Sequence, residues 1–157
     1  MATLERAIEI AARAHAGAVD RQQQPYILHP VRVMMGVDDP EARIVAILHD
    51  VIEDSETTLD DIRREGFSDA VLTALELVTR NEGTSFADYV VRCKSNALAT
   101  LVKLADLKDN AALHRLMLRP DRVRKDTKRI QRYVFSYQFL TDQIDEPTYR
   151  RLMKPAE

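Results

Sequence analysis

Four ionisable side chains stand close together at the end of an apolar segment: His49, Asp50, Glu53 and Asp54. Glu53 follows His49 by four positions and Asp50 by three, so on a helix these groups can share one face. Asp54 lies one turn beyond Asp50. Three carboxylates at this spacing repel one another, and a divalent cation relieves the repulsion. The segment is therefore a candidate metal site, in which Glu53 and Asp54 are placed to steer protons.

Two positions elsewhere in the chain have the right chemistry to join this site. His29 precedes Pro30, and proline suits the first turn of a helix, so His29 is expected at a helix N-terminus. Asp106 interrupts the apolar stretch 98–105, and Asn110 follows it one turn later on the same side. Each residue alone is more typical of a cap, a buried histidine or a surface carboxylate. Their combination with the first segment favours a shared function.

The four candidate ligands are His29, His49, Asp50 and Asp106. Two imidazoles and two carboxylates suit a first-row ion such as Mn²⁺, Fe²⁺ or Zn²⁺ better than calcium or a thiolate-preferring metal. Coordination positions that the protein leaves open would accept water and a phosphate oxygen. This donor set indicates metal-assisted hydrolysis of a phosphoester.

The elements that must position these residues are predicted to be helices. Apolar residues recur at three-and-four spacing along most of the chain, which is typical of amphipathic helices. We expect a loop over 18–25 and helices over 4–16, 29–37, 41–52, 57–64, 68–79, 85–94, 96–118, 121–144 and 147–153. No series of alternating strand-like segments and no internal repeat is found. The sequence predicts an all-α, irregular bundle of about eight to ten helices.

Composition limits the function classes. The 157 residues suit a single domain spanning 1–157, and a formal net charge of −2 gives no excess of positive charge for a nucleic-acid partner. Cys93 is the one cysteine, which excludes an intramolecular disulfide. No apolar stretch approaches the roughly 20 residues of a membrane span, and the charged segment Met1 to Ala18 is unlike a signal peptide. We expect a cytoplasmic protein, and the sequence leaves open whether it forms an oligomer.

The chain resembles the hydrolase domain of the RelA/SpoT-type alarmone enzymes, and still more the free-standing small alarmone hydrolases. The matching blocks are residues 14–17, 24–30, 46–54 and 102–110, with a fainter one at 129–133. The resemblance implies an HD-type bundle that binds one Mn²⁺ through His29, His49, Asp50 and Asp106.

The same resemblance implies a reaction. In this family the Glu-Asp pair, here Glu53 and Asp54, serves the attacking water, and the 3′-pyrophosphate of (p)ppGpp is hydrolysed to give pyrophosphate and GDP or GTP. Asn110 and Tyr133 match residues that contact the nucleotide substrate. No synthetase domain is expected within the 157 residues.

The sequence also departs from the family pattern around the substrate. Many members carry a basic pair in the loop before the Pro-Tyr-Ile block, where this chain has Arg21 beside Asp20. Arg80 lies near the position of another basic residue and is a candidate substrate contact. These departures affect residues around the substrate and leave the metal ligands intact. The alternatives are an HD phosphohydrolase acting on another nucleotide or phosphoester, and a non-catalytic nucleotide-sensing module.

Overall fold

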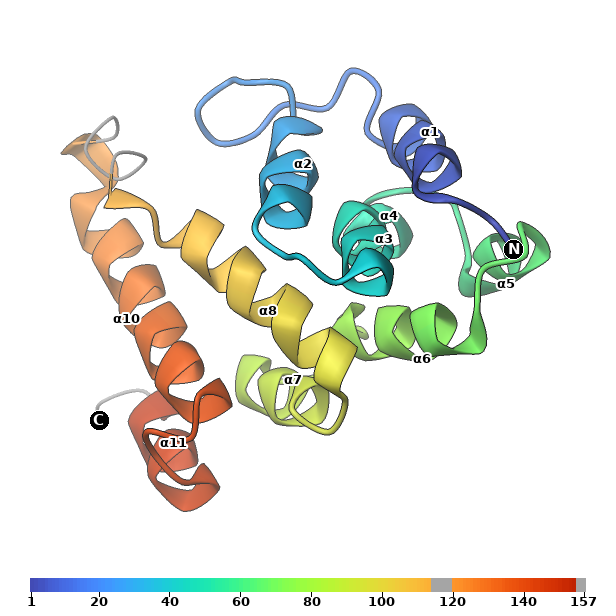
Figure 1. The fold of residues 1–157 in the computed structure, drawn as a ribbon. Helices are drawn as coiled ribbons and strands as arrows, with labels where there is room; N and C mark the ends of the chain where they lie inside the picture. The colour runs from blue at the N-terminus through green and yellow to red at the C-terminus, as the bar shows by residue number, and fades with distance from the viewer. Residues whose placement is uncertain (114–119, 155–157) are drawn as a thin grey trace.

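The computed structural model describes residues 1–113 and 120–154, and within them the chain is helical. Figure 1 shows the helices packed at different angles, with α8 running through the middle. The all-α class predicted from the sequence is confirmed. The elements are α1 (Leu4–Ala14), α2 (Leu28–Met35), α3 (Pro40–Leu48), α4 (Val51–Asp54), α5 (Leu59–Arg64), α6 (Asp69–Val78), α7 (Phe86–Cys93), α8 (Ala97–Asn110), the 3₁₀ turn η1 (Pro120–Arg122), α10 (Val123–Leu140) and α11 (Glu146–Met153).

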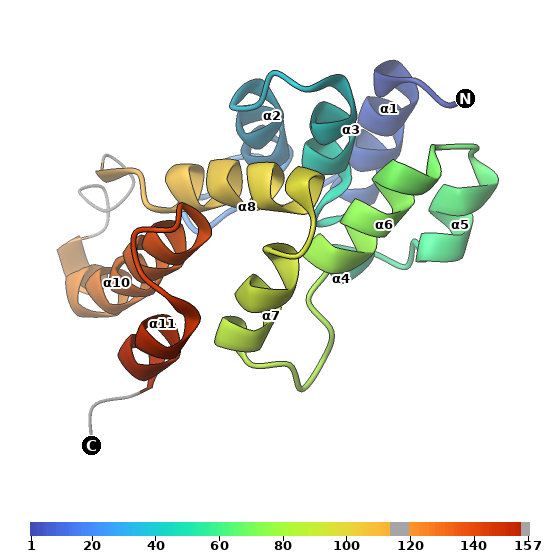
Figure 2. The ribbon, with the colours of Figure 1, turned by 60° about the horizontal axis from the view of Figure 1, so that its bottom comes forward.

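Helices α3 and α8 form the centre of the bundle. Helix α3 packs against α1, α2, α6 and α8, and α8 also contacts α7 and α10, as the two views in Figures 1 and 2 show. A helix enclosed by neighbours buries apolar residues on most of its sides. Accordingly, four consecutive residues of α3, Val45 to Leu48, are fully buried. The C-terminal end of α3 leads directly into two of the candidate metal ligands, His49 and Asp50.

Local sequence signals explain where most helices begin. Asp39 is the N-cap of α3 and accepts a hydrogen bond from the Ala42 N–H, with Pro40 in the first turn. Thr58 and Asp61 form a reciprocal capping box at the start of α5. Each cap lies within three positions of the backbone group that it binds, so the local sequence is enough to encode it.

The predicted helix over 41–52 is wrong, because α3 ends at Leu48 and α4 begins at Val51. The Nδ1 atom of His49 lies 2.7 Å from the carbonyl oxygen of Ala46. That oxygen is the acceptor that a continuing helix would offer to the Asp50 N–H. The histidine ring therefore occupies the hydrogen-bonding position where the helix stops, and the break reorients Asp50.

The late helices also differ from the prediction. Helix α8 ends at Asn110, where the sequence pattern predicted a helix to about residue 118; residues 114–119 lie outside the described part of the chain. Helix α10 begins at Val123, after η1, and ends at Leu140. In the described residues, no helix combines the length and apolar character that a bilayer crossing requires.

Candidate metal centre

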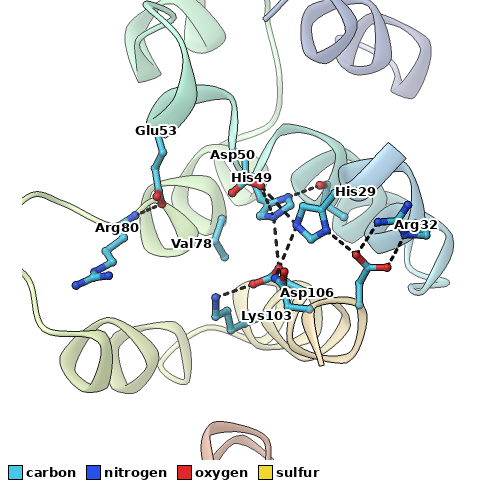
Figure 3. Close-up of polar contacts among 12 residues, drawn as sticks. His29, Arg32, His49, Asp50, Glu53, Val78, Arg80, Lys103 and Asp106 are labelled. Atoms are coloured by element: carbon cyan, nitrogen blue, oxygen red, sulfur yellow. Dashed lines mark hydrogen bonds and ion pairs between the residues drawn. The ribbon is translucent and has the colours of Figure 1, made fainter. Parts of the chain in front are cut away.

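Four side chains converge between α2, the α3–α4 junction and α8. The Nε2 atom of His29 lies 3.3 Å from Asp106 Oδ1 and 3.6 Å from Asp50 Oδ2. The Nε2 atom of His49 lies 3.1 Å from Asp50 Oδ2 and 3.8 Å from Asp106 Oδ1. Ligands about 2 Å from one first-row ion are separated by about 3 to 4 Å. Three of the residues singled out in the sequence, His29, His49 and Asp106, each have a ligand atom within 4.8 Å of the others, and Asp50 lies beside both imidazoles, as Figure 3 shows.

The orientation of His49 fits a metal ligand. Its side chain is buried, and its Nδ1 must donate to the Ala46 carbonyl oxygen, which can only accept. In the neutral ring this leaves a lone pair on Nε2. Among the described residues, Nε2 is buried and makes no hydrogen bond, although Asp50 Oδ2 lies 3.1 Å away. A buried nitrogen without a partner is costly, and coordination to a cation at the common point would satisfy it.

His29 is held from its other side by Asp109. Its Nδ1 lies 2.7 Å from Asp109 Oδ2, which turns Nε2 toward the cluster. Arg32 donates from Nε to Asp109 Oδ1 at 2.6 Å and from Nη2 to Oδ2 at 3.1 Å. The sequence interpretation did not assign Asp109 to the site. Its position three residues after Asp106, on the same face of α8, was the available signal.

The cluster attracts positive charge. Burial lowers the pKa of His29, but its hydrogen bonds with Asp106 and Asp109 outweigh this effect and raise the pKa to about 9. Burial raises the pKa of Asp50, but the adjacent His49 imidazole outweighs it and lowers the pKa to about 2. The pKa of Asp106 is also lowered, since Lys103 and the imidazoles outweigh its burial. Carboxylates that stay ionised in this setting are suited to bind a divalent cation.

Lys103 supports Asp106 from below the cluster. This lysine is buried, and its Nζ lies 2.7 Å from Asp106 Oδ2 and 4.6 Å from the centre of the Tyr89 ring. Burial lowers the pKa of Lys103, but the charge of Asp106 dominates and raises the pKa well above its usual value. Because Lys103 engages Oδ2, Asp106 presents Oδ1 to the imidazoles. That oxygen also accepts a hydrogen bond from Asn110 Nδ2.

A cavity of about 200 Å³ opens beside His29. Three of the four predicted substrate-binding residues line it: Arg21, Asn110 and Tyr133. Tyr26 and Asp20 complete its polar wall. These residues come from the loop before α2, from α8 and from α10, so the fold brings together positions that are far apart in sequence.

Comparisons with known proteins place the chain in a family, although it matches no protein-family model. A GTP pyrophosphokinase from Streptomyces coelicolor is 30% identical over 144 residues, which cover 83% of this chain and 17% of that protein. A guanosine-3′,5′-bis(diphosphate) 3′-pyrophosphohydrolase from Haemophilus influenzae is 35% identical over 133 residues, 76% of this chain and 20% of that protein. The chain belongs to the RelA/SpoT-type HD domain family.

A solved structure of a metazoan SpoT ortholog, described as hydrolysing ppGpp, has the same fold as this RelA/SpoT-type domain. The TM-score is 0.64 at 22% identity, covering 91% of this chain and 96% of that chain. The curated relatives are much longer: this RelA/SpoT-type domain spans 17% and 20% of the two proteins named above. The match concerns one segment of those enzymes.

Within this RelA/SpoT-type domain, Glu53 and Asp54 have different surroundings. An oxygen of Glu53 accepts a hydrogen bond from the backbone N–H of Arg80, on the side away from His29 in Figure 3. Asp54 lies close to Tyr26, whose hydroxyl donates its hydrogen bond to Asp50 Oδ2 at 2.6 Å. The single helical face predicted for residues 49–54 is wrong, because the helix breaks between α3 and α4.

The pKa values of both carboxyl groups are raised. Partial burial is the main cause for each, although both residues keep contact with solvent, and the negative charge of Asp50 adds to it. A carboxylate with a raised pKa is a better proton acceptor than an ordinary surface carboxylate. Glu53 and Asp54 therefore have the electrostatic character expected of proton-handling groups in this domain.

The fourth predicted substrate residue, Arg80, lies apart from the cavity beside His29. Its guanidinium donates to the carbonyl oxygen of Thr84 from Nε at 3.0 Å and from Nη2 at 2.8 Å. The link between Arg80 and the cluster is its backbone N–H, which binds Glu53. Its assignment as a substrate contact stays a prediction.

Proposed function

We propose that this domain is a Mn²⁺-dependent hydrolase of the 3′-pyrophosphate of (p)ppGpp that releases pyrophosphate and GDP or GTP. The observation that carries the proposal is the convergence of His29, His49, Asp50 and Asp106 beside a polar cavity. Relatives of this chain are named for that activity. The sequence-based expectation of a cytoplasmic enzyme remains part of the proposal.

The metal ligands of the proposal are the four converging side chains. When bound there, a divalent ion supplies positive charge to phosphate oxygens and makes water easier to deprotonate. Mn²⁺ is the proposed ion, and Fe²⁺ or Zn²⁺ suits the same mixed nitrogen and oxygen donors. Lys103 and Asp109 keep two of the ligands oriented through their hydrogen bonds.

The proton in the proposed reaction is taken by the Glu53 and Asp54 pair. Both carboxyl groups have raised pKa values, mainly through partial burial, which increases their basicity. Asp54 lies close to Tyr26, whose hydroxyl donates to the proposed metal ligand Asp50. A proton acceptor is therefore near the ligand set.

The nucleotide occupies the cavity next to His29. Arg21 has a planar guanidinium that can bind a phosphate or stack on a purine, and the ring of Tyr133 offers an aromatic surface. Asn110 lines the same cavity and is hydrogen-bonded to Asp106, so it joins the nucleotide site to the metal site. The scissile phosphate would then lie beside the ligands.

The proposal is tested by incubating the protein with ppGpp and Mn²⁺ and measuring pyrophosphate and GDP. Equal amounts of both products are expected. Replacing Glu53 with Gln or Asp54 with Asn should lower kcat by about 100-fold or more while Mn²⁺ remains bound. The exposed carboxylate Glu56 provides a control, since Glu56→Gln should leave kcat unchanged.

A second candidate is hydrolysis of a less highly charged nucleotide. Among the described residues that line the cavity, Arg21 is the single cation, and Asp20 lies beside it. A panel of nucleotides assayed with Mn²⁺ separates the two candidates. Turnover of another nucleotide without pyrophosphate release from ppGpp would replace the first proposal, and binding without turnover of any nucleotide would favour a sensing module.

A further inference from the structure

Asp109 contacts a proposed metal ligand on the side that faces away from the metal position. Its Oδ2 lies 2.7 Å from His29 Nδ1, and its side chain is 11% exposed. Arg32 binds both carboxylate oxygens, with distances of 2.6 Å from Nε to Oδ1 and 3.1 Å from Nη2 to Oδ2. The carboxylate is thus fixed on one side by a guanidinium and on the other by an imidazole.

We infer that Asp109, held by Arg32, is a positioning residue that fixes the tautomer and the ring orientation of His29 for metal binding. The inference rests on the metal site of the proposed function. It concerns a contact between protein groups, so it can be tested with the metal alone, without a nucleotide.

The chemistry of the contact carries the inference. An ionised carboxylate can only accept a hydrogen bond, so Nδ1 of His29 must be the protonated nitrogen. The lone pair of the neutral ring is then on Nε2, which faces Asp106 Oδ1 at 3.3 Å. A carboxylate partner also makes an imidazole a stronger donor to a metal, and such partners commonly support histidine ligands.

Arg32 supplies the geometric restraint on the carboxylate. The two parallel hydrogen bonds of a guanidinium fix the plane of a carboxylate, which a single charged group cannot do. The positive charge of the Arg32 guanidinium, which contacts both oxygens, favours the ionised carboxylate and keeps Oδ2 directed at His29.

The two imidazoles of the site are supported differently. His49 donates through Nδ1 to a neutral carbonyl oxygen, that of Ala46, whereas His29 faces a charged group. The contact also connects His29 on α2 to the part of the site on α8, because Asp109 lies on the same turn of α8 as the proposed ligand Asp106 and the cavity residue Asn110. A loss of the Asp109 carboxylate should consequently affect His29 more than His49.

The first test measures the dissociation constant of Mn²⁺ by calorimetry for the wild type, Asp109→Asn and Asp109→Ala. Both variants should bind Mn²⁺ about 10- to 100-fold more weakly. The matched control is Asp88→Asn, which removes another carboxylate paired with an arginine, Arg150, far from the ligands in sequence. Unchanged Mn²⁺ affinity in folded Asp109→Ala would overturn the inference and leave the proposed function intact.

The second test uses Arg32, whose replacement leaves Asp109 in place. Arg32→Met and Arg32→Lys should both weaken Mn²⁺ binding, because neither side chain has the planar guanidinium that binds both oxygens of Asp109. The effect should be smaller than that of losing Asp109, which remains in place in both variants. Arg43→Met is the control, since Arg43 is as exposed as Arg32, at 39% against 40%, and binds the Val37 carbonyl oxygen. Equal Mn²⁺ affinity in Arg32→Met and Arg43→Met would contradict the role given to Arg32.

A third measurement reads the tautomer itself. Nitrogen-detected NMR of the Zn²⁺-loaded wild type should show His29 protonated at Nδ1 and coordinated through Nε2. In Asp109→Ala the proton on His29 Nδ1 should exchange with water faster, and the Nδ1 signal should shift. The His49 signals, which depend on the contact with Ala46, should not change. Unaltered His29 signals would show that the ring is held by packing alone and would refute the positioning role.

Discussion

At the scale of single residues, the metal centre depends on side chains whose other polar atoms are already engaged. Lys103 binds one oxygen of Asp106, Asp109 binds one nitrogen of His29, and the Ala46 carbonyl binds one nitrogen of His49. Each of these three proposed ligands keeps one donor atom directed at the cluster, although Asn110 also donates a hydrogen bond to that atom of Asp106. This one-sided saturation is the reason why the donors converge before any ion is bound.

Lys103→Met provides a test of this balance. Removing the buried cation leaves Asp106 without its partner, and breaking a buried ion pair costs about 3 to 5 kcal/mol. We expect the free energy of unfolding of the metal-free protein to fall by about 3 kcal/mol, and by less when Mn²⁺ is present, since the ion also neutralises Asp106. Urea denaturation with and without Mn²⁺ measures both values.

Lys94→Met is the control for that experiment. Lys94 binds the exposed Asp142 and the Phe139 carbonyl oxygen, away from the ligands. Its loss should change stability by about 1 kcal/mol or less, because a surface ion pair contributes little, and Mn²⁺ should not alter the effect. A Lys103→Met protein as stable as the wild type without metal would refute the supporting role of Lys103.

At the scale of elements, helix α3 and the break that follows it set the position of two ligands. Its start is fixed by the Asp39 cap and Pro40, and its end by the contact between His49 and Ala46. The break separates α3 from α4, so Asp50 faces the imidazoles while Glu53 faces the backbone of Arg80. A continuous helix would have kept these carboxylates on a single face.

Asp39→Ala should lower the free energy of unfolding by about 1 kcal/mol, because the Ala42 N–H loses its capping partner. Asp39→Ser should restore most of that loss, since serine caps about as well as aspartate. Chemical denaturation of the three proteins measures the difference. Equal stability of the alanine and serine variants would mean that the cap does not stabilise α3.

At the scale of the whole molecule, the proposed ligands come from three segments that are far apart in the chain: the start of α2, the α3–α4 junction and the middle of α8. An ion bound by all three segments would link α2, the α3–α4 junction and α8 to one another. Because binding only to the folded state stabilises it, Mn²⁺ at 100 times its dissociation constant should add about 2.7 kcal/mol.

Differential scanning fluorimetry should show this as a rise in Tm of about 5 to 10 °C with Mn²⁺. Chelation of the metal should reverse it. Asp106→Ala should show no rise, since the remaining proposed ligands come from α2 and the α3–α4 junction and lose the contribution of α8. A full Mn²⁺-dependent rise in that variant would exclude Asp106 as a ligand.

The sequence alone determined the helical class, the caps of α3 and α5, and the residue types of the site. These features depend on local periodicity and on side chains that bind their own neighbourhood, and both are visible in the order of residues. The combination of two imidazoles and two carboxylates also followed from residue type, and the matching blocks around it indicated the family.

Only the tertiary structure decided how those side chains are oriented. The break after Leu48 arises from the contact of the His49 ring with Ala46, and apolar periodicity does not encode such a contact. The pairing of His29 with Asp109 joins α2 to α8, and that of Lys103 with Asp106 depends on the aromatic rings packed around the lysine. The contact between His29 and Asp109 depends on the distance between segments remote in sequence. The other two join residues three positions apart, but they form only because packing buries and orients these side chains.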